Sequence, residues 1–546
     1  PHPPNAYEFK LGLAESDQNR GITPTITAQE LQRWKEGLYD PANGLDYRSF
    51  DYYDFVIKQK FPYPQYFLNA GASGASDKSS YYFSVSNIKQ DSPLPSHYYT
   101  RTNIQSNLEA KLAQGLKIGT QISARRELRH SSGLPGWDDY ANLVTSVIRM
   151  WPTERPYAND NPNYVNNTHS ININPGTFPE RFTGYADNLE RIFRGNVYAE
   201  YDFGFGLKVR GTFGYGYSFD DDEYFEYTYD AYTYDRLTDT YNVVPGGGNQ
   251  NPFRANQRTT NEDLFVQLQG TFNKKIKKHS INAVAAYELS NNAYTFIYLH
   301  TIPPNNYIIP MYFADLNELS NSYSKSARAS VIGRVNYNYD ERYLIEILGR
   351  YDGSYFYAPG NRWGLFPGIS VGWRISNEEF FTPLKNIISD LKLRASWGKT
   401  GSETGVSAFA YQSGFTWGSG NYIFNGSNIT GIRPTGLPVT NLSWVNNITT
   451  NIGFDMSLFK GRINTQFDIF KRLVTGIPAA RYDVLLPSEV GYSLPNENLN
   501  KTGNYGVEGM ITYNGKIGQV NYSVGGNATL RSEERRVGKE CQSVCR

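Results

Sequence analysis

The chain has 546 residues, of which 15% are aromatic, and it contains 44 Tyr, 30 Phe and 50 Gly. Its formal net charge is +1 at pH 7, which gives no basic footprint of a nucleic-acid-binding protein. The mean hydropathy is −0.55, and the sequence contains no run of about 20 apolar residues that could form a transmembrane helix. A membrane protein built of strands is not excluded, because a barrel strand exposes only alternate residues to lipid.

Residues 1–62 differ in pattern from the rest of the chain. Ile26–Leu38 predicts a helix, because Thr27 is followed three residues later by Glu30, which is the spacing of a capping box. A polar connection rich in Asp and Tyr follows through residues 51–54. The pattern of strands begins only at Tyr66.

Successive hairpins are predicted from Tyr66 onward. Short turns are expected at Ser76–Lys78, Ala113–Gly115, Gly204–Gly206, Lys274–Lys278, Asp340–Glu341 and Lys460–Gly461. Long connections are expected at residues 129–188, 219–253 and 401–438. A structureless loop as long as the first would count against a compact soluble domain.

The clearest strand signal runs from Ala327 to Gly401. Apolar residues take every second position from Ala327 to Tyr339, and the alternation returns in three further runs that end near Trp397. A period of two gives each strand one apolar and one polar face, so four such runs predict an antiparallel meander. The apolar face carries Ala, Gly and Tyr among its aliphatic residues, with Tyr or Trp near the strand ends. This composition favours a transmembrane β-barrel over a soluble sandwich.

Signals for catalysis and metal binding are weak. The six histidines are scattered without a ligand spacing such as HExxH, and no G-x-S-x-G elbow lies between a strand and a helix. The Tyr/Asp cluster from Asp220 to Asp235 offers oxygen ligands for a hard cation, or a stacking platform for a sugar, but it lacks EF-hand spacing. The sequence therefore predicts no catalytic residue, no metal site and no cofactor.

Three ordered motifs in the clearest stretch resemble the barrel of the SusC/RagA family of TonB-dependent transporters. They are GRVNYNYDERYLIEILGRYDGS (Gly333–Ser354), NRWGLFPGISVGWRISNEEFF (Asn361–Phe381) and LKLRASWGKTG (Leu391–Gly401). Weaker similarity to the family extends from about Ser73 to Leu530. Val445, after Trp444, departs from the acidic residue that the family usually has there.

The resemblance implies an all-β fold, namely a transmembrane antiparallel β-barrel of about 22 strands when complete and truncated here. Residues 1–62 would be the C-terminal end of the N-terminal plug domain and its connection to the barrel. Residues 63–530 would be a partial barrel with long extracellular loops. The chain begins at Pro1 without an initiator Met or an export signal, so it is either a mature form or a fragment. We expect an interior fragment, because a barrel of this family would need several more strands after the last recognisable hairpin, Gly503–Leu530.

The function implied by the resemblance is active import across the outer membrane. The transporter would take up oligosaccharides or peptides together with a SusD-like surface lipoprotein, and the TonB–ExbB–ExbD complex would supply the energy by pulling on the plug. Outer-membrane lipid would surround the barrel, and specificity would lie in the long connections. The protein would not be an enzyme.

Three alternatives stay open. One is a TonB-dependent receptor for an iron chelate, which would lack the motif at Asn361–Arg374. Another is a passive porin, which would lack any plug segment before Tyr66. A secreted all-β glycan-binding or glycan-cleaving protein is the third, and it would be soluble without detergent.

Two groups of side chains are candidates for binding. The connection Ser354–Trp363 would lie at the extracellular mouth, where aromatic faces stack on a sugar or peptide and a guanidinium donates to carboxylate or carbonyl groups. An aromatic girdle is the alternative for this connection. The candidates in it are Tyr355, Phe356, Tyr357, Arg362 and Trp363. A second group occupies the polar positions of the alternating strands and should face the lumen. These charged residues would form a ladder that pairs with the plug or with one another, and they are Arg334, Glu346, Arg350, Arg374 and Arg394.

The final stretch, residues 531–546, is dense in charge and breaks the strand alternation. It resembles the translation of a sequencing adapter and is expected to be a non-native tail, with a basic solvated tail as the alternative. Its two cysteines, Cys541 and Cys545, are the only ones in the chain. No metal or redox site is therefore predicted from them.

Overall fold

The computed structural model describes residues 5–57, 62–133, 140–169, 173–307, 314–418, 422–434, 436–481, 484–487, 489 and 494–536. Sixteen strands build one large sheet: β3 (Gln65–Ala75), β4 (Ser79–Asp91), β5 (Tyr98–Ala113), β6 (Leu116–Ser132), β7 (Gly184–Asp202), β8 (Leu207–Glu226), β11 (Phe253–Ile276), β12 (His279–Ile302), β13 (Asp315–Tyr339), β14 (Tyr343–Ser354), β15 (Trp363–Arg374), β16 (Ile388–Ser402), β21 (Val445–Leu458), β22 (Ile463–Ala479), β23 (Glu497–Ile517) and β24 (Val520–Arg536).

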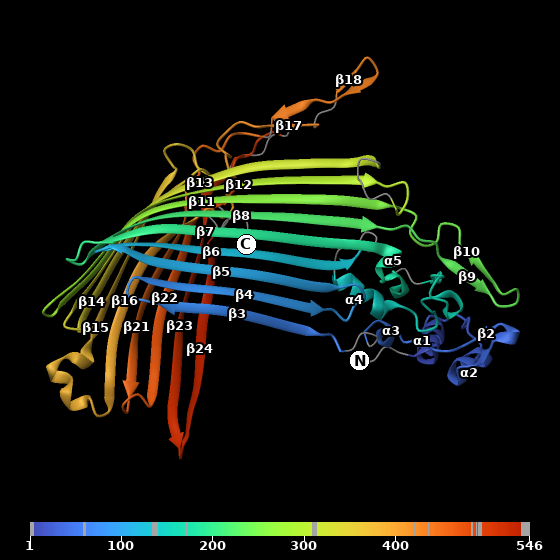
Figure 1. The fold of residues 1–546 in the computed structure, drawn as a ribbon, viewed down its shortest axis with the longest axis horizontal. Helices are drawn as coiled ribbons and strands as arrows, with labels where there is room; N and C mark the ends of the chain where they lie inside the picture. The colour runs from blue at the N-terminus through green and yellow to red at the C-terminus, as the bar shows by residue number, and fades with distance from the viewer. Residues whose placement is uncertain are drawn as a thin grey trace.

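Each strand of this sheet pairs antiparallel with the next one along the chain, from β3 at one edge to β24 at the other. Figure 1 shows the strands sweeping round as a strongly curved wall. The all-β class and the antiparallel up-and-down order are confirmed. None of the described helices is both long enough and apolar enough to cross a membrane.

Short turns gather at one end of the strands, and almost all the long connections lie at the other. The turns predicted at Ser76–Lys78, Gly204–Gly206 and Asp340–Glu341 fall between paired strands, as expected. Asp340 and Glu341 both have positive φ, of 54° and 55°, as a type I′ hairpin turn requires. The short-turn end has one longer connection, residues 375–387, which contains the 3₁₀ helices η6 (Ile375–Asn377) and η7 (Glu379–Leu384).

The meander predicted from Ala327 to Gly401 is confirmed as β13 to β16. Its register aligns Val331 with Tyr351 and Tyr351 with Leu365, so apolar residues of neighbouring strands share one face. Ile369 pairs with Trp397 on the same face. Strand β13 begins earlier than the alternation indicated, at Asp315.

The N-terminal residues form three helices and a small hairpin: α1 (Ala6–Asn19), α2 (Ala28–Glu36), β1 (Tyr39–Asp40), β2 (Leu45–Asp46) and α3 (Tyr52–Ile57). The predicted helix is α2, and the Thr27 hydroxyl accepts a hydrogen bond from the Glu30 backbone N–H at 3.1 Å. Helix α1 was not predicted, although Asn5 and Glu8 form a complete capping box. The assignment of residues 1–62 to the end of a plug stays a prediction, and a competing assignment is argued below.

The first long connection is not structureless, so that expectation was wrong. Strand β6 continues to Ser132, and the connection contains α4 (Tyr140–Arg149), two 3₁₀ helices, η3 (Ala158–Asp160) and η4 (Pro175–Thr177), and α5 (Glu180–Thr183). Val147 and Met150 pack in a buried cluster with Tyr52, Val56 of α3 and Phe178. The partners of α4 are therefore distant in sequence, which is why the local pattern did not reveal it.

The other long connections also contain paired strands. Residues 227–252 hold the hairpin of β9 (Tyr232–Asp235) and β10 (Thr240–Val243). Residues 403–444 hold two short hairpins, β17 (Phe415–Trp417) with β20 (Ile432–Pro434), and β18 (Tyr422–Phe424) with β19 (Ser427–Ile429). Figure 1 shows β17 and β18 projecting from the sheet.

Strand β24 runs through the first residues of the predicted tail. Arg536 pairs with Lys501, so the strand does not stop at Leu530. Residues 537–546, with both cysteines, lie outside the described residues. The non-native origin of residues 531–546 stays a prediction.

Candidate functional site

The large sheet has one apolar and one polar face, as the alternation predicted. On the apolar face, bulky side chains such as Ile347, Leu365 and Leu393 are exposed, with 55%, 57% and 42% of their surface accessible. Their neighbours along the same strands, Leu348, Phe366 and Arg394, lie on the opposite face together with most of the charged residues. A face that exposes rows of aliphatic side chains is suited to an apolar solvent.

The expected ladder of charges lies on the polar face, and three of its five members have ionic partners there. Arg350 on β14 contacts Glu288 on β12 and Asp352, both at 3.1 Å. Arg374 lies 3.5 Å from Asp390. These arginines thus pair with carboxylates of the same wall, which satisfies charges that would be costly if isolated.

Arg394 makes the densest of these ionic contacts. Its guanidinium on β16 donates to Asp455 on β21 at 3.1 Å and to both oxygens of Asp468 on β22 at 2.5 Å. In the register, Arg394 pairs with Gly453, and Gly453 pairs with Asp468. A Cβ at Gly453 would stand 2.5 Å from an oxygen of Asp468, so glycine leaves the space in which the two side chains meet. Sequence analysis did not identify Gly453, Asp455 or Asp468.

The other two members of the ladder, Arg334 and Glu346, have no ion pair among the residues that the structure describes. They lie on the polar face of β13 and β14, where Arg334 pairs with Leu348 and Asn336 pairs with Glu346. Arg334 is exposed and Glu346 is half-buried. Both charges are therefore available to a group that occupies the space in front of this wall.

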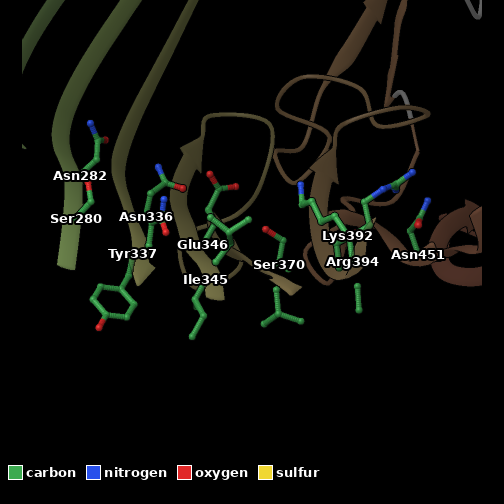
Figure 2. Close-up of a pocket in the computed structure, with 16 residues that line it drawn as sticks. Ser280, Asn282, Asn336, Tyr337, Ile345, Glu346, Ser370, Lys392, Arg394 and Asn451 are labelled. Atoms are coloured by element: carbon green, nitrogen blue, oxygen red, sulfur yellow. The ribbon is translucent and has the colours of Figure 1, made fainter. Parts of the chain in front are cut away.

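A cavity of about 390 Å³ lies on the polar face near the short-turn end. In Figure 2, Asn282, Asn336, Glu346, Ser370, Lys392, Arg394 and Asn451 point to one side, and Tyr337 and Ile345 point away from them. The row crosses six strands, from β12 to β21. Amides, hydroxyls and charges of both signs suit a polar protein segment or a hydrated solute better than an apolar ligand.

The aromatic and arginine candidates Tyr355 to Trp363 lie in the connection between β14 and β15 and at the first residue of β15, and the structure separates them. Tyr357 is 1% exposed and packs in a buried cluster with Val406 and Leu442, and Phe356 packs against it. Trp363 lies on the apolar face, where its ring stacks on Tyr351 at 4.9 Å. The positions of Tyr357 and Trp363 therefore support packing and an aromatic girdle, respectively, rather than substrate contact.

Tyr355 and Arg362 are the candidates of this connection that stay half-exposed and outside the cluster. The Tyr355 ring lies 5.3 Å from the ring of Phe409 in the 403–444 connection. Arg362 donates to the Tyr357 carbonyl at 3.4 Å and to the Tyr411 hydroxyl at 3.5 Å. Their contact with a substrate stays a prediction.

The Tyr/Asp cluster from Asp220 to Asp235 does not form one site. Asp221 pairs with Arg258 at 3.0 Å, whereas Asp220 and Asp222 lie on the other face of β8 and Asp235 lies on β9. In the described ranges, no three or more His, Cys, Asp and Glu side chains are grouped so that they could hold a metal ion.

Comparison with known proteins gives concordant matches. The family model described as "TonB dependent receptor-like, beta-barrel" matches residues 136–540. TonB-dependent receptor P26 of Formosa agariphila is 26% identical over 492 residues, which cover 86% of this chain and 45% of that protein. TonB-dependent receptor SusC of Bacteroides thetaiotaomicron is 32% identical over 198 residues, which cover 36% of this chain and 19% of that protein.

Among solved structures, the RagAB peptide importer in its open-open state superposes with a TM-score of 0.75 at 18% identity. The match covers 96% of this chain and 58% of that chain. At this identity the likeness shows the shared fold. The chain spans about half the length of the curated relatives that it matches over most of its length.

The family model covers most of the chain, and the sixteen-stranded sheet with one apolar and one charged face has the form that such a barrel wall requires. The chain belongs to the TonB-dependent receptor-like β-barrel family.

Proposed function

We propose that the chain is the barrel part of a SusC-like TonB-dependent transporter of the outer membrane. The substrate class is oligosaccharides or peptides, which are captured together with a SusD-like surface lipoprotein. The TonB–ExbB–ExbD complex supplies the energy. The protein is a transporter and not an enzyme, and transport requires no cofactor.

The observation that carries this proposal is the separation of the two faces of the sheet. Rows of exposed aliphatic and aromatic side chains occupy one face, and the paired arginines and carboxylates around Arg350 and Arg394 occupy the other. In a membrane, the first face contacts lipid and the second lines a polar lumen. Arg334 and Glu346, which have no ion pair among the described residues, would then meet the plug.

Closure of the barrel is part of the proposal. Strands β3 and β24 each have one edge without a partner strand among the described residues. An unpaired backbone edge is costly in hydrocarbon, because no water is present to satisfy its N–H and C=O groups. We propose that further strands of the whole protein pair with both edges and close the barrel. The closed barrel would then have roughly 22 strands, as plugged transporters do.

The relatives support the partners and the substrate class. The proteins of similar sequence carry the names TonB-dependent receptor and SusC, and the structure of similar fold is a peptide importer. The half-exposed Tyr355 and Arg362 would contact substrate at the mouth.

Fractionation of the native organism tests location. With an antibody against this chain, we expect the whole protein in the detergent-extracted outer membrane, with a gel mobility that changes on heating. Recovery in the soluble fraction would contradict the proposal and favour the secreted all-β protein.

Uptake measurements test the transport step. A strain without the gene is expected to lose uptake of one class of labelled oligosaccharide or peptide, and a protonophore is expected to abolish that uptake in the wild type. Uptake that survives the protonophore would indicate a passive porin. Loss of iron-chelate uptake alone would indicate the other class of receptor.

A further inference from the structure

The direction of β3 fixes where the N-terminal residues lie. Strand β3 runs from Gln65 toward the short turn at Ser76–Lys78, so its first residue is at the end of the sheet that carries the long connections. Figure 1 shows α1, α2 and α3 beside α4, α5, β9 and β10 at that end. In a barrel of this family, short turns face the periplasm and long loops face the outside.

A buried apolar cluster joins the N-terminal residues to the long connections. Tyr52 and Val56 of α3 pack with Leu94, which precedes β5, and with Val147 and Phe178 of the 133–183 connection. The Phe50 backbone N–H donates to the Pro152 carbonyl at 2.8 Å. Residues 5–57 therefore share a core with the loops of the long-connection end.

Asp46 joins three segments of the chain by charge. Its carboxylate accepts from Arg48 at 2.8 Å and from Arg236 of the β9–β10 hairpin at 2.8 Å, and it lies 3.6 Å from Arg155 of the 133–183 connection. Only 11% of the Asp46 side chain is exposed. Loss of this nearly buried carboxylate would remove one partner from all three arginines, so Asp46 holds the three segments in fixed positions.

Asp160 extends the same network. It contacts Arg155 at 2.7 Å and Arg48 at 3.3 Å, and the Arg48 guanidinium lies 3.8 Å from the centre of the Tyr39 ring. Two carboxylates thus share three arginines that come from residues 5–57, 133–183 and 227–252. We call this set, Asp46, Arg48, Arg155, Asp160 and Arg236, the rim clamp.

We propose that residues 5–57 form a module of the extracellular rim, locked by the rim clamp onto the loops 133–183 and 227–252, and are not the end of the plug. This inference rests on the proposed function, because it takes its orientation from the membrane. In this arrangement, helices and hairpins form one side of the mouth before any ligand binds. A ligand arriving from outside would therefore meet a surface that includes residues 5–57.

Labelling of single cysteines on intact cells tests the proposal, with the whole protein in its outer membrane. Ser16→Cys on α1 and Lys35→Cys on α2 are exposed test positions. Thr238→Cys in the β9–β10 turn is the control for the outside, and Asp77→Cys in the β3–β4 turn is the control for the periplasm. The probe is a membrane-impermeant maleimide, applied before and after the outer membrane is permeabilised.

We expect Ser16→Cys and Lys35→Cys to label on intact cells as strongly as Thr238→Cys, and Asp77→Cys to label at least about tenfold less until the membrane is permeabilised. If neither α1 nor α2 labels on intact cells while the two controls behave as stated, the module is not on the rim and this inference is overturned alone. If Asp77→Cys labels on intact cells like Thr238→Cys, the membrane orientation is wrong and the proposed function fails as well.

Discussion

Arg394 on β16 reaches past β21 and holds both carboxylate oxygens of Asp468 on β22 at 2.5 Å. The contact therefore joins strands that are not neighbours in the sheet. Backbone pairing fixes only adjacent strands, and this side-chain contact adds a restraint across three of them. It also places a nearly buried carboxylate on the polar face, where Arg394 is its ionic partner among the described residues.

Removal of that guanidinium is expected to destabilise the wall. Arg394→Gln leaves Asp468, whose side chain is 9% exposed, without a cationic partner, at a cost of about 3 kcal/mol. In the whole protein, heat-modifiable gel mobility should show unfolding at a lower temperature. Lys392→Gln is the matched control, because Lys392 lies 4.0 Å from Asp455 and its loss should shift the transition little. If the two variants lowered the unfolding temperature equally, the contact between Arg394 and Asp468 would not stabilise the wall more than the longer contact of Lys392.

The assignment of faces can be tested at two adjacent residues of β15. Val371 is 45% exposed on the apolar face, and Ser370 lines the polar cavity. Val371→Arg is expected to cost about 1–2 kcal/mol, because arginine would face lipid between the middle of the bilayer and the short-turn end, and to reduce the amount of folded protein in the outer membrane. Ser370→Arg should be tolerated. Quantitative blotting of the heat-modifiable form would measure both, and the reverse order of the two variants would contradict the face assignment.

The rim clamp is expected to weaken in acid. Burial raises the pKa of Asp46, but hydrogen bonds from Arg48 and the charges of Arg155 and Arg48 outweigh this and lower the pKa below its usual value. A carboxyl group with a lowered folded-state pKa stabilises the fold above its unfolded pKa, near 3.9, and loses that contribution as the pH falls through the folded value. The protection factors for hydrogen exchange within residues 5–57, which correct for the intrinsic pH dependence of exchange, should therefore be unchanged from pH 8 to 5 and should fall below about pH 4.

Asp46→Asn gives the control for this pH dependence. The variant should show lower protection factors within residues 5–57 already at neutral pH, and these should fall less in acid than those of the wild type. Glu36→Gln removes an exposed charge at the end of α2, outside the rim clamp, and should change neither. An identical pH profile in wild type and Asp46→Asn would show that another group controls the module.

Tyr357 distinguishes packing from binding in the connection between β14 and β15. Tyr357→Ala should leave a cavity beside Val406 and Leu442 at a cost of about 3 kcal/mol and make the 403–444 connection more sensitive to protease. Tyr357→Phe should cost less than about 1 kcal/mol, because the hydroxyl makes only a long contact of 3.5 Å with the Ser402 carbonyl. Protease digestion of the two variants measures this difference. Loss of substrate affinity in Tyr357→Phe without a change in digestion would instead support direct contact with a ligand.

The alternation of side chains predicted the sheet because lipid and water select opposite residue types at successive positions. The pattern at Ala327–Tyr339 is local, and it gave the correct face for Val331, Arg334 and their neighbours. Helix α2 was likewise predicted from Thr27 and Glu30, since a capping box acts within four residues. The capping box of Asn5 and Glu8 carries the same signal and would have predicted α1.

The missed features depend on residues that are far apart in the chain. Arg236 lies 190 residues from Asp46, and no periodicity relates them. The burial of Tyr357 depends on Val406 and Leu442. From the sequence alone, this aromatic residue in a connection was therefore predicted to be exposed for substrate binding, whereas it is buried. Local patterns report which solvent a strand faces, and they do not report which loops meet.

Gly453 separates Arg394 from Asp468 in a single row across the sheet, and this makes the three positions interdependent in their mutational history. A methyl group at 453 would displace the Asp468 carboxylate and crowd the Phe467 carbonyl. Part of the destabilisation by a substitution at 453 would thus come from loss of the contact between Arg394 and Asp468. A chain in which Arg394 has already been replaced no longer has this contact, so the same substitution would destabilise it less. The order in which the substitutions arise would decide which of them selection removes, so tolerance at 453 is conditional on residue 394 rather than a property of the glycine itself.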